Sequence, residues 1–247
     1  DVEILPVGLS SLDIDLEHFK SRLRADTALV SFMFANNETG ALYPIKEMAK
    51  LAHEAGALFH SDCVQGLGKT ALDVSQLDVD FASFSAHKVY ALKGCGVTYI
   101  KTGSQLESLL HGGGQERRRR AGTENLLAIS ALAKVCGLED EVYKKAMDGM
   151  KRLQVQMENG IKDIEGVRIN GEEGLRLCNT TNFVVDGVDG ETLLMNLDMK
   201  GIRISTGAAC SSGSNEPSPV LRAMGLSREE ASSSMRASLG WFNTEEE

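Results

Sequence analysis

A lysine and an aspartate follow two short apolar runs of this chain and could act together on one bound molecule. Lys88 comes shortly after the apolar run 79–84, and Asp62 directly follows the run 57–61. A lysine amine can form a Schiff base with the aldehyde of pyridoxal phosphate (PLP), and a carboxylate can keep the pyridine nitrogen protonated. This pair is typical of PLP enzymes, although a lysine after a strand is more often a solvated surface group.

The composition describes an ordinary globular protein and argues against two classes of partner. Of the 247 residues, 42% are hydrophobic and 25% are charged, and the formal net charge is -9. An acidic chain does not favour nucleic acid, because phosphate backbones need a basic surface. There is no membrane-spanning run and no signal peptide, so we expect no membrane partner and a cytoplasmic location. Because the chain opens at Asp1, a removed targeting segment would leave no trace, and in a eukaryote the mitochondrial matrix is the alternative.

The cysteines indicate a reducing compartment. The five of them lie far apart without a CxxC pair, which excludes a familiar zinc spacing and gives little support for a disulfide framework. We therefore expect no metal site. Cys210 lies in a polar loop, whereas the other four are expected to be small core residues: Cys63, Cys95, Cys136 and Cys178.

The order of apolar and helical patterns predicts an α/β fold with a mainly parallel sheet. The expected elements are a helix over 15–23, a strand over 28–34, a helix from Pro44 to a stop at Gly56, and strands over 57–61, 79–84 and 96–100. Strands without polar alternation, separated by helices, indicate a sheet buried on both faces. Functional groups gather at the carboxyl ends of such strands. The polar residues expected there are Asn37, Asp62, Gln65, His87 and Lys88.

We expect two domains, a large one over 1–145 and a smaller α+β domain over 146–247. A long helical stretch from about Asn125 to Ile164 would lead from one to the other. The smaller domain is expected to contain strands over 181–185, 202–205 and 235–239 and helices over 191–199 and 219–224. The strand 235–239 would place Arg236 at its start.

Seven motifs occur in a fixed order along the chain. They are Asn36-Asn37-Glu38-Thr39-Gly40, Ser61-Asp62-Cys63-Val64-Gln65, Ser85-Ala86-His87-Lys88, Gly112-Gly113-Gly114-Gln115-Glu116-Arg117, Arg120-Ala121-Gly122-Thr123-Glu124-Asn125, Ser205-Thr206-Gly207-Ala208-Ala209-Cys210 and Arg236-Ala237-Ser238-Leu239-Gly240. Together they resemble the NifS/IscS-type cysteine desulfurases, class V aminotransferase-like PLP enzymes of fold type I. The resemblance covers nearly the whole chain. It implies conversion of L-cysteine to L-alanine and an enzyme-bound persulfide for iron-sulfur cluster or other sulfur-transfer biosynthesis.

The resemblance assigns roles to four residues around the PLP ring. Lys88 would hold the cofactor as an internal aldimine and then move the substrate α-proton. Asp62 would form a salt bridge with the pyridinium nitrogen. Gln65 would reach the ring hydroxyl. Asn37 would lie near the same edge, where it could also contact the substrate.

Three more residues are expected at the cofactor phosphate. Ser85 and His87 lie close to Lys88 in the sequence and could donate hydrogen bonds to the phosphate. His87 could instead be a packed histidine. In the resembled family the threonine matching Thr123 contacts the partner subunit's cofactor, which implies a homodimer. The adjacent run 117–120 of four arginines would then belong to the dimer interface rather than to a nucleic-acid site or a solvated basic face. Arg118 stands where the family commonly has glycine.

Cys210 and Arg236 are the residues expected to act on the substrate. Small polar residues around Cys210 describe a mobile, exposed loop, where a thiol is accessible. The resemblance implies that Cys210 attacks the sulfur of the bound substrate and carries the persulfide to a scaffold or other acceptor protein. Arg236 would grip the substrate carboxylate with its two-pronged guanidinium.

Two other interpretations remain open. Selenocysteine lyase shares the fold and most of the motifs. The chain could also be a non-catalytic dimerisation or scaffold-binding fragment, because the family's N-terminal phosphate loop, its ring-stacking histidine and its final helices have no counterpart in this sequence.

Overall fold

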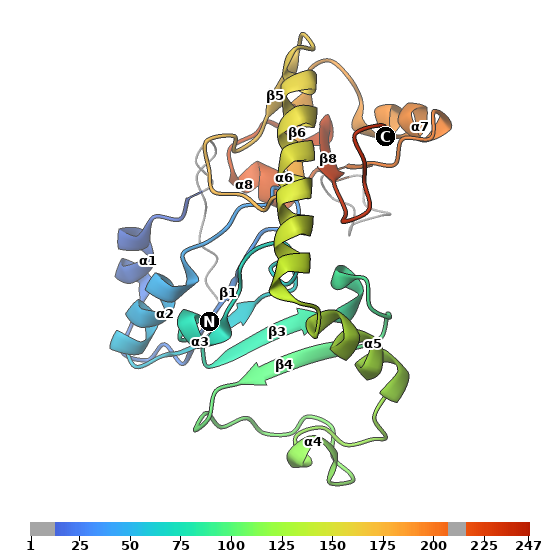
Figure 1. Cartoon of the computed structure of the whole chain (residues 1–247). Coiled ribbons are helices and arrows are strands. Elements are labelled where there is room, and N and C mark those ends of the chain that lie inside the picture. Colours follow the sequence, from blue (N-terminus) through green and yellow to red (C-terminus); the bar gives the residue numbers. More distant parts are fainter. Residues whose placement is uncertain (1–12, 207–215) are drawn as a thin grey trace.

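The structure is a computed structural model that describes residues 13–206 and 216–247. Two four-stranded sheets lie along the long helix α6 (Asp140–Lys162), as Figure 1 shows. Residues of the first sheet and the helices around it are called the first unit below, and the chain from α6 onward the second, while the expected division into two domains stays a prediction. Position 145 falls inside this continuous helix, so no loop separates the units there, and the 145/146 boundary stays a prediction.

The first sheet has the expected, mainly parallel arrangement in the order β1-β2-β3-β4. Its first three strands are parallel and β4 is antiparallel to β3. The bounds are β1 Leu29–Met33, β2 Leu58–Asp62, β3 Phe81–Ser85 and β4 Gly96–Ile100. The helices before β4 are α1 (Leu16–Arg22), α2 (Ile45–Glu54), α3 (Val74–Leu77) and the 3-10 helix η1 (Ala86–Val89).

The second sheet is antiparallel, in the order β5-β6-β8-β7. Its strands are β5 Val167–Ile169, β6 Thr180–Val185, β7 Ser205–Thr206 and β8 Ser234–Ser238. The helices of this unit are α7 (Gly190–Met199), α8 (Pro219–Ala223) and α9 (Arg228–Ser232). The sequence analysis missed β5 and α9. The start of α9 does carry a signal, because Ser227 and Glu230 form a reciprocal capping box.

The expected long helical stretch over about 125–164 is interrupted once, because the structure has two helices there. Helix α5 (Leu126–Cys136) ends at the C-cap residue Gly137, and α6 begins at Asp140. Glycine commonly ends helices because it loses the most backbone freedom inside them. The short helix α4 (Gln115–Arg118) precedes this pair, beyond β4 in Figure 1.

One face of the first sheet is exposed along β1 and β2, so the expectation of burial on both faces is wrong for these two strands. Leu29 and Leu58 are register partners on β1 and β2, and they are 52% and 41% exposed. Residues on the opposite face include Phe59, which is fully buried where α2 contacts the sheet. The exposed face matters for function, because strand alternation places Asp62 on it.

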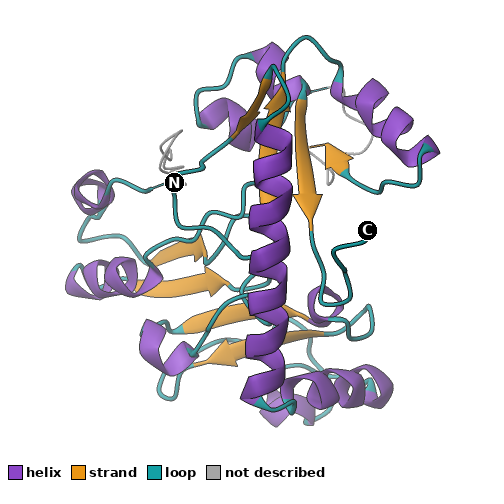
Figure 2. Ribbon diagram, turned by 45° about the horizontal axis from the view of Figure 1, so that its top comes forward, coloured by secondary structure: helices purple, strands orange, loops and turns teal. Residues whose placement is uncertain are grey.

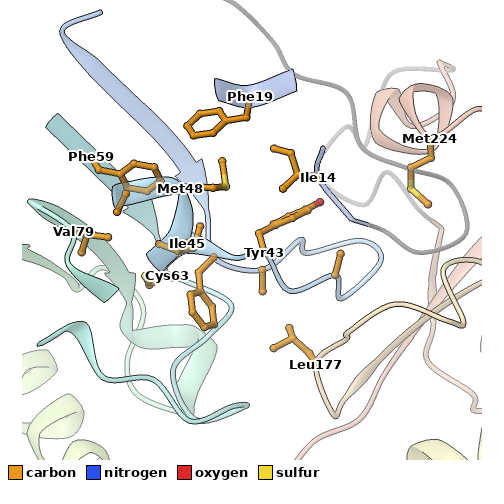
Figure 3. Packing of buried hydrophobic residues seen from close by; sticks show 14 of the residues in the cluster. Ile14, Phe19, Tyr43, Ile45, Met48, Phe59, Cys63, Val79, Leu177 and Met224 are labelled. Atoms are coloured by element: carbon orange, nitrogen blue, oxygen red, sulfur yellow. The ribbon is translucent and has the colours of Figure 1, made fainter. Parts of the chain in front are cut away.

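A shared hydrophobic core joins the two units. Figure 3 shows Phe59 and Met48 of the first unit on one side and Leu177 and Met224 of the second on the other. All four side chains are at most 3% exposed. Close packing of this kind fixes the position of the second sheet relative to the first. Figure 2 shows the long helix α6 lying across both sheets.

A buried ion pair reinforces this arrangement. Glu158, on α6, pairs with Arg176, which precedes β6. Arg176 Nη1 lies 2.7 Å from Glu158 Oε1, and the two side chains are only 6% and 8% exposed. Thr181 Oγ1 donates a second hydrogen bond to the same carboxylate at 2.7 Å. Burial opposes ionisation, but the hydrogen bonds from Arg176 and Thr181 hold the pKa of Glu158 below its ordinary value.

None of the described helices is long and apolar enough to cross a membrane.

Arg176→Ala should destabilise the protein by about 3–5 kcal/mol, because it leaves the Glu158 carboxylate buried without its cation. Equilibrium urea unfolding measures this loss. Arg152→Ala is the matched control, since Arg152 lies on the same helix as Glu158 but makes an exposed ion pair with Glu245. That control should cost no more than about 1 kcal/mol. Equal losses in the two variants would contradict the prediction.

Candidate active site

The parallel register brings the predicted cofactor-binding residues to one edge of the first sheet. Asp62 is the last residue of β2 and pairs in register with Met33 of β1 and Ser83 of β3. Its carboxylate is exposed and accepts a hydrogen bond from the Val64 amide at 2.9 Å. An exposed strand-end carboxylate with one such bond keeps acceptor capacity for a ligand.

Lys88 lies directly beyond the neighbouring strand end. Ser85 is the last residue of β3 and the N-cap of η1, and η1 contains both His87 and Lys88. Both of these side chains are exposed, so the alternative of a packed His87 is wrong. By strand alternation, Ser85 faces the same side of the sheet as Asp62.

A row of hydrogen bonds crosses this same face beside Asp62. His60 Nδ1 lies 2.8 Å from Ser31 Oγ, and its Nε2 lies 2.9 Å from Ser83 Oγ. Burial lowers the pKa of His60, against a smaller opposing effect of the Asp62 charge. The row links β1, β2 and β3 and holds their side chains in place next to the Asp62 carboxylate. The sequence analysis did not identify it, because its members are separated by 23 to 29 positions.

The second unit brings Arg236 to the end of β1. The expected position at a strand start is wrong, because Arg236 lies inside β8 and pairs with Asn182 and Ser205. Its Nη1 donates to the Asn37 carbonyl at 3.0 Å. Its Nε is buried and has no hydrogen-bond partner among the described residues. A buried donor normally has a partner, so this nitrogen is suited to an anionic ligand.

Glu38 is a site residue that the sequence analysis quoted only as part of a motif. Its buried carboxylate accepts from Ser218 Oγ at 2.6 Å, and its carbonyl accepts from Asn182 Nδ2 at 3.3 Å. Burial raises its pKa, while Ser218 and the charge of Arg236 act in the opposite direction. The loop that carries Asn37 is therefore tied to the second unit on both sides.

Lys69 is the second residue that the sequence analysis did not place in the site. It is half-buried, and its Nζ donates to Gln65 Oε1 at 2.5 Å. Burial, followed by the charge of Lys88, lowers the pKa of Lys69 from 10.5 to about 8, and Arg236 adds to this lowering. Three cationic side chains from three parts of the chain therefore lie near one another. Such a cluster needs an anion to balance it.

The cysteines fall into different environments. Cys63 is fully buried, and burial raises the pKa of its thiol to about 11, so it is a poor nucleophile. Cys95 and Cys178 are half-buried, whereas Cys136 is exposed, so its expected core position is wrong. These four are free thiols. Cys210 lies outside the described residues, and its role stays a prediction.

Thr123 is exposed in the segment between α4 and α5, with no hydrogen bond to the other site residues in the described part of the chain. The nearby Arg118 has a φ of 65°. This left-handed conformation favours glycine and is uncommon for other residues. The arginine therefore occupies a position for which glycine is better suited.

A profile of the aminotransferase class-V family matches residues 2–247. The chain belongs to this family. It is 44% identical to a cysteine desulfurase IscS from Clostridium botulinum over 249 residues, which are 100% of this chain and 62% of that protein. It is 42% identical to the cysteine desulfurase NifS of Azotobacter vinelandii over 235 residues, which are 95% of this chain and 58% of that protein. The chain thus spans about three fifths of the length of these curated relatives.

Solved structures agree with the fold. A NifS-like protein superposes with a TM-score of 0.90 at 36% identity, covering 100% of this chain and 64% of its own. A NifS-like protein from Rickettsia africae gives a TM-score of 0.89 at 33% identity, and the match covers 99% of this chain and 66% of that protein's chain. The expected resemblance and the expected fold class, the α/β fold of type I, are confirmed.

The residues present fit PLP. The cofactor has an anionic phosphate, a ring nitrogen that a carboxylate can pair with and an aldehyde that an amine can attack. Near the cluster of Lys69, Lys88 and Arg236, the carboxylates in the described part of the chain are the buried Glu38 and the exposed Asp62. This donor set suits an anionic cofactor together with an anionic substrate.

Lys69 should lose its proton near pH 8 in cofactor-free protein. Burial and the charge of Lys88 both disfavour the ammonium form, so removing that charge with Lys88→Met should raise the midpoint. A pH titration of isotope-labelled lysine side chains by NMR measures both values. Lys46→Met, at an exposed position of α2, should leave the midpoint unchanged. A Lys69 midpoint near 10.5 in the unsubstituted protein would contradict the prediction.

Proposed function

We propose that the natural protein containing this chain is a PLP-dependent cysteine desulfurase that converts L-cysteine to L-alanine and an enzyme-bound persulfide. The observation that carries the proposal is the meeting of Asp62, Lys88 and Arg236 at one sheet edge, with Arg236 Nε buried and unpaired in the described structure. The names of the similar proteins favour L-cysteine over L-selenocysteine as the substrate.

Each residue would contribute a defined operation. PLP, when bound, supplies an electron-accepting ring. Lys88 Nζ would attach the cofactor and later take the proton from the substrate α-carbon. Asp62 would hold the ring nitrogen in its protonated form. Arg236 would orient the substrate carboxylate through Nε, because its Nη1 is already held by the Asn37 carbonyl.

The remaining contacts would orient the cofactor. Ser85 and His87, at the start of η1, are placed to donate to its phosphate. Gln65 and Asn37 would lie at the ring edge that carries the hydroxyl group. Thr123 would reach the phosphate in a second copy of the chain, and its exposure between α4 and α5 supports this role. We therefore infer a homodimer.

Cys210 would receive the sulfur. Its thiolate would attack the substrate sulfur, so that a sulfur–sulfur bond forms as the carbon–sulfur bond breaks and the electron pair returns to the carbon. Protonation of that carbon gives alanine. The persulfide would then pass to an iron-sulfur scaffold or another acceptor protein. We place the protein in the cytoplasm, consistent with the described helices, none of which could span a membrane.

Borohydride reduction of the PLP-loaded protein at its natural length should attach the cofactor covalently to Lys88. Lys88 lies in η1, which follows the end of β3, and β3 is the strand next to the one that ends at Asp62. Peptide mapping by mass spectrometry locates the label, and Lys88→Ala should abolish it while Lys46→Ala does not. A protein that takes up no PLP, or a label on Lys69 or Lys93, would refute the assignment.

Cys210→Ala should retain PLP and L-cysteine binding but lose at least about a thousandfold in alanine formation, as expected when a covalent nucleophile is removed. Mass spectrometry after turnover by the unsubstituted protein should find the extra sulfur on Cys210. Cys63 is the matched control, because its buried thiol is held protonated. A normal desulfuration rate in Cys210→Ala would defeat the persulfide mechanism.

A further inference from the structure

The orientation of the Gln65 side-chain amide is determined by Lys69. An amide can present either its oxygen or its NH2 group to a ligand, and the two orientations have the same shape. The Lys69 ammonium has three donors and no acceptor, so the atom that faces it at 2.5 Å must be Oε1. Nε2 then points away from Lys69, and the Gln65 amide makes no other hydrogen bond within the described structure.

The turn that carries Lys69 is held rigidly. Within it, the Lys69 amide donates to the Gly66 carbonyl at 3.1 Å. Two side chains of the second unit donate hydrogen bonds to backbone carbonyls of this turn. Trp241 Nε1 donates to the Gly68 carbonyl at 3.2 Å, and Cys178 Sγ donates to the Lys69 carbonyl at 3.0 Å. Gly68 itself has a φ of +71°, and an added Cβ would lie 3.2 Å from the Trp241 ring. The lysine stem is therefore fixed at its base.

We propose that Lys69 is a positioning residue that holds Gln65 with its Nε2 hydrogens directed at the oxygen substituent of the PLP ring. This inference rests on the proposed function. The ring oxygen carries negative charge when the cofactor is attached to a lysine, so it needs a donor and would be repelled by Oε1. Lys69 thus selects the one amide orientation that stabilises that charge.

The buried position of Lys69 among cations supports a role tied to the ligand. A half-buried lysine near Lys88 and Arg236 is unfavourable for stability alone. Among the described residues, the group that raises the pKa of Lys69 is the Cys178 thiol, and burial raises the pKa of that thiol in turn. The hydrogen bond to Gln65 is therefore the contact that accounts for its placement.

The test compares PLP binding and visible absorption in variants of the protein at its natural length. Lys69→Met keeps the stem but removes the donor, and should weaken PLP binding roughly two- to tenfold, the range for one lost hydrogen bond. It should also move the pH midpoint of the visible band upward, because the ring oxygen loses its donor. Gln65→Glu should do the same, since a carboxylate has no N–H. Lys69→Arg, which still donates to Oε1, should stay close to the unsubstituted protein.

A double-mutant cycle with Gln65→Ala separates positioning from a direct charge effect. If Lys69 acts through Gln65, the loss in the double variant is smaller than the product of the two single losses. A loss equal to that product overturns the proposal, as does a Lys69→Met variant that matches the surface control Lys46→Met. If the unsubstituted protein binds no PLP, the proposed function fails and this inference fails with it. A PLP-binding protein with unchanged Lys69→Met refutes the positioning role alone.

Discussion

The parallel register of β1, β2 and β3 is the constraint on which the rest of the site depends. Parallel strands must all end at the same edge, so the segments that follow them meet although they are far apart in sequence. Asp62 ends β2, and Lys88 lies in η1 just beyond β3. The hydrogen-bonded row of Ser31, His60 and Ser83 locks this register on the same face. A shift of one residue would turn Asp62 to the buried side.

The second sheet completes the site through contacts with the loops of the first. Hydrogen bonds join Arg236 to Asn37 and Ser218 to Glu38 at the β1 loop. Trp241 and Cys178 bind the turn after β2. The common core and the buried ion pair of Glu158 with Arg176 hold the two sheets together. The polar contacts between them therefore keep a fixed geometry.

Charge balance connects the architecture to chemistry. Lys69, Lys88 and Arg236 come from a turn, a 3-10 helix and a strand of the second sheet, and the fold places their charges near one another. Glu38 is the described carboxylate whose pKa responds to Arg236, and burial opposes its ionisation. An anionic cofactor and substrate would relieve the mutual repulsion, so the same feature that lowers the pKa of Lys69 favours their binding.

The sequence by itself determined the fold class, most strands to within two residues, and the strand-end positions of Asp62 and Lys88. Apolar runs and helix-ending residues such as Gly56 are local signals, and the motifs are short enough to be recognised without coordinates. The break between α5 and α6 was missed because the apolar pattern continues past Gly137. The exposed face of β1 and β2 was missed because hydrophobicity reports the tendency to be buried, not what covers a given strand.

Only the tertiary structure decided which polar groups pair. The contact of Arg236 with Asn37 spans 199 positions, and that of Ser218 with Glu38 spans 180. No local pattern encodes such distances, because they follow from how the two sheets pack around their common core. Even the contact of Lys69 with Gln65, only four positions apart, depends on a turn whose carbonyls accept hydrogen bonds from Trp241 and Cys178, two residues that are distant in sequence. Residue types can therefore be read from the sequence, whereas their partners depend on the packing.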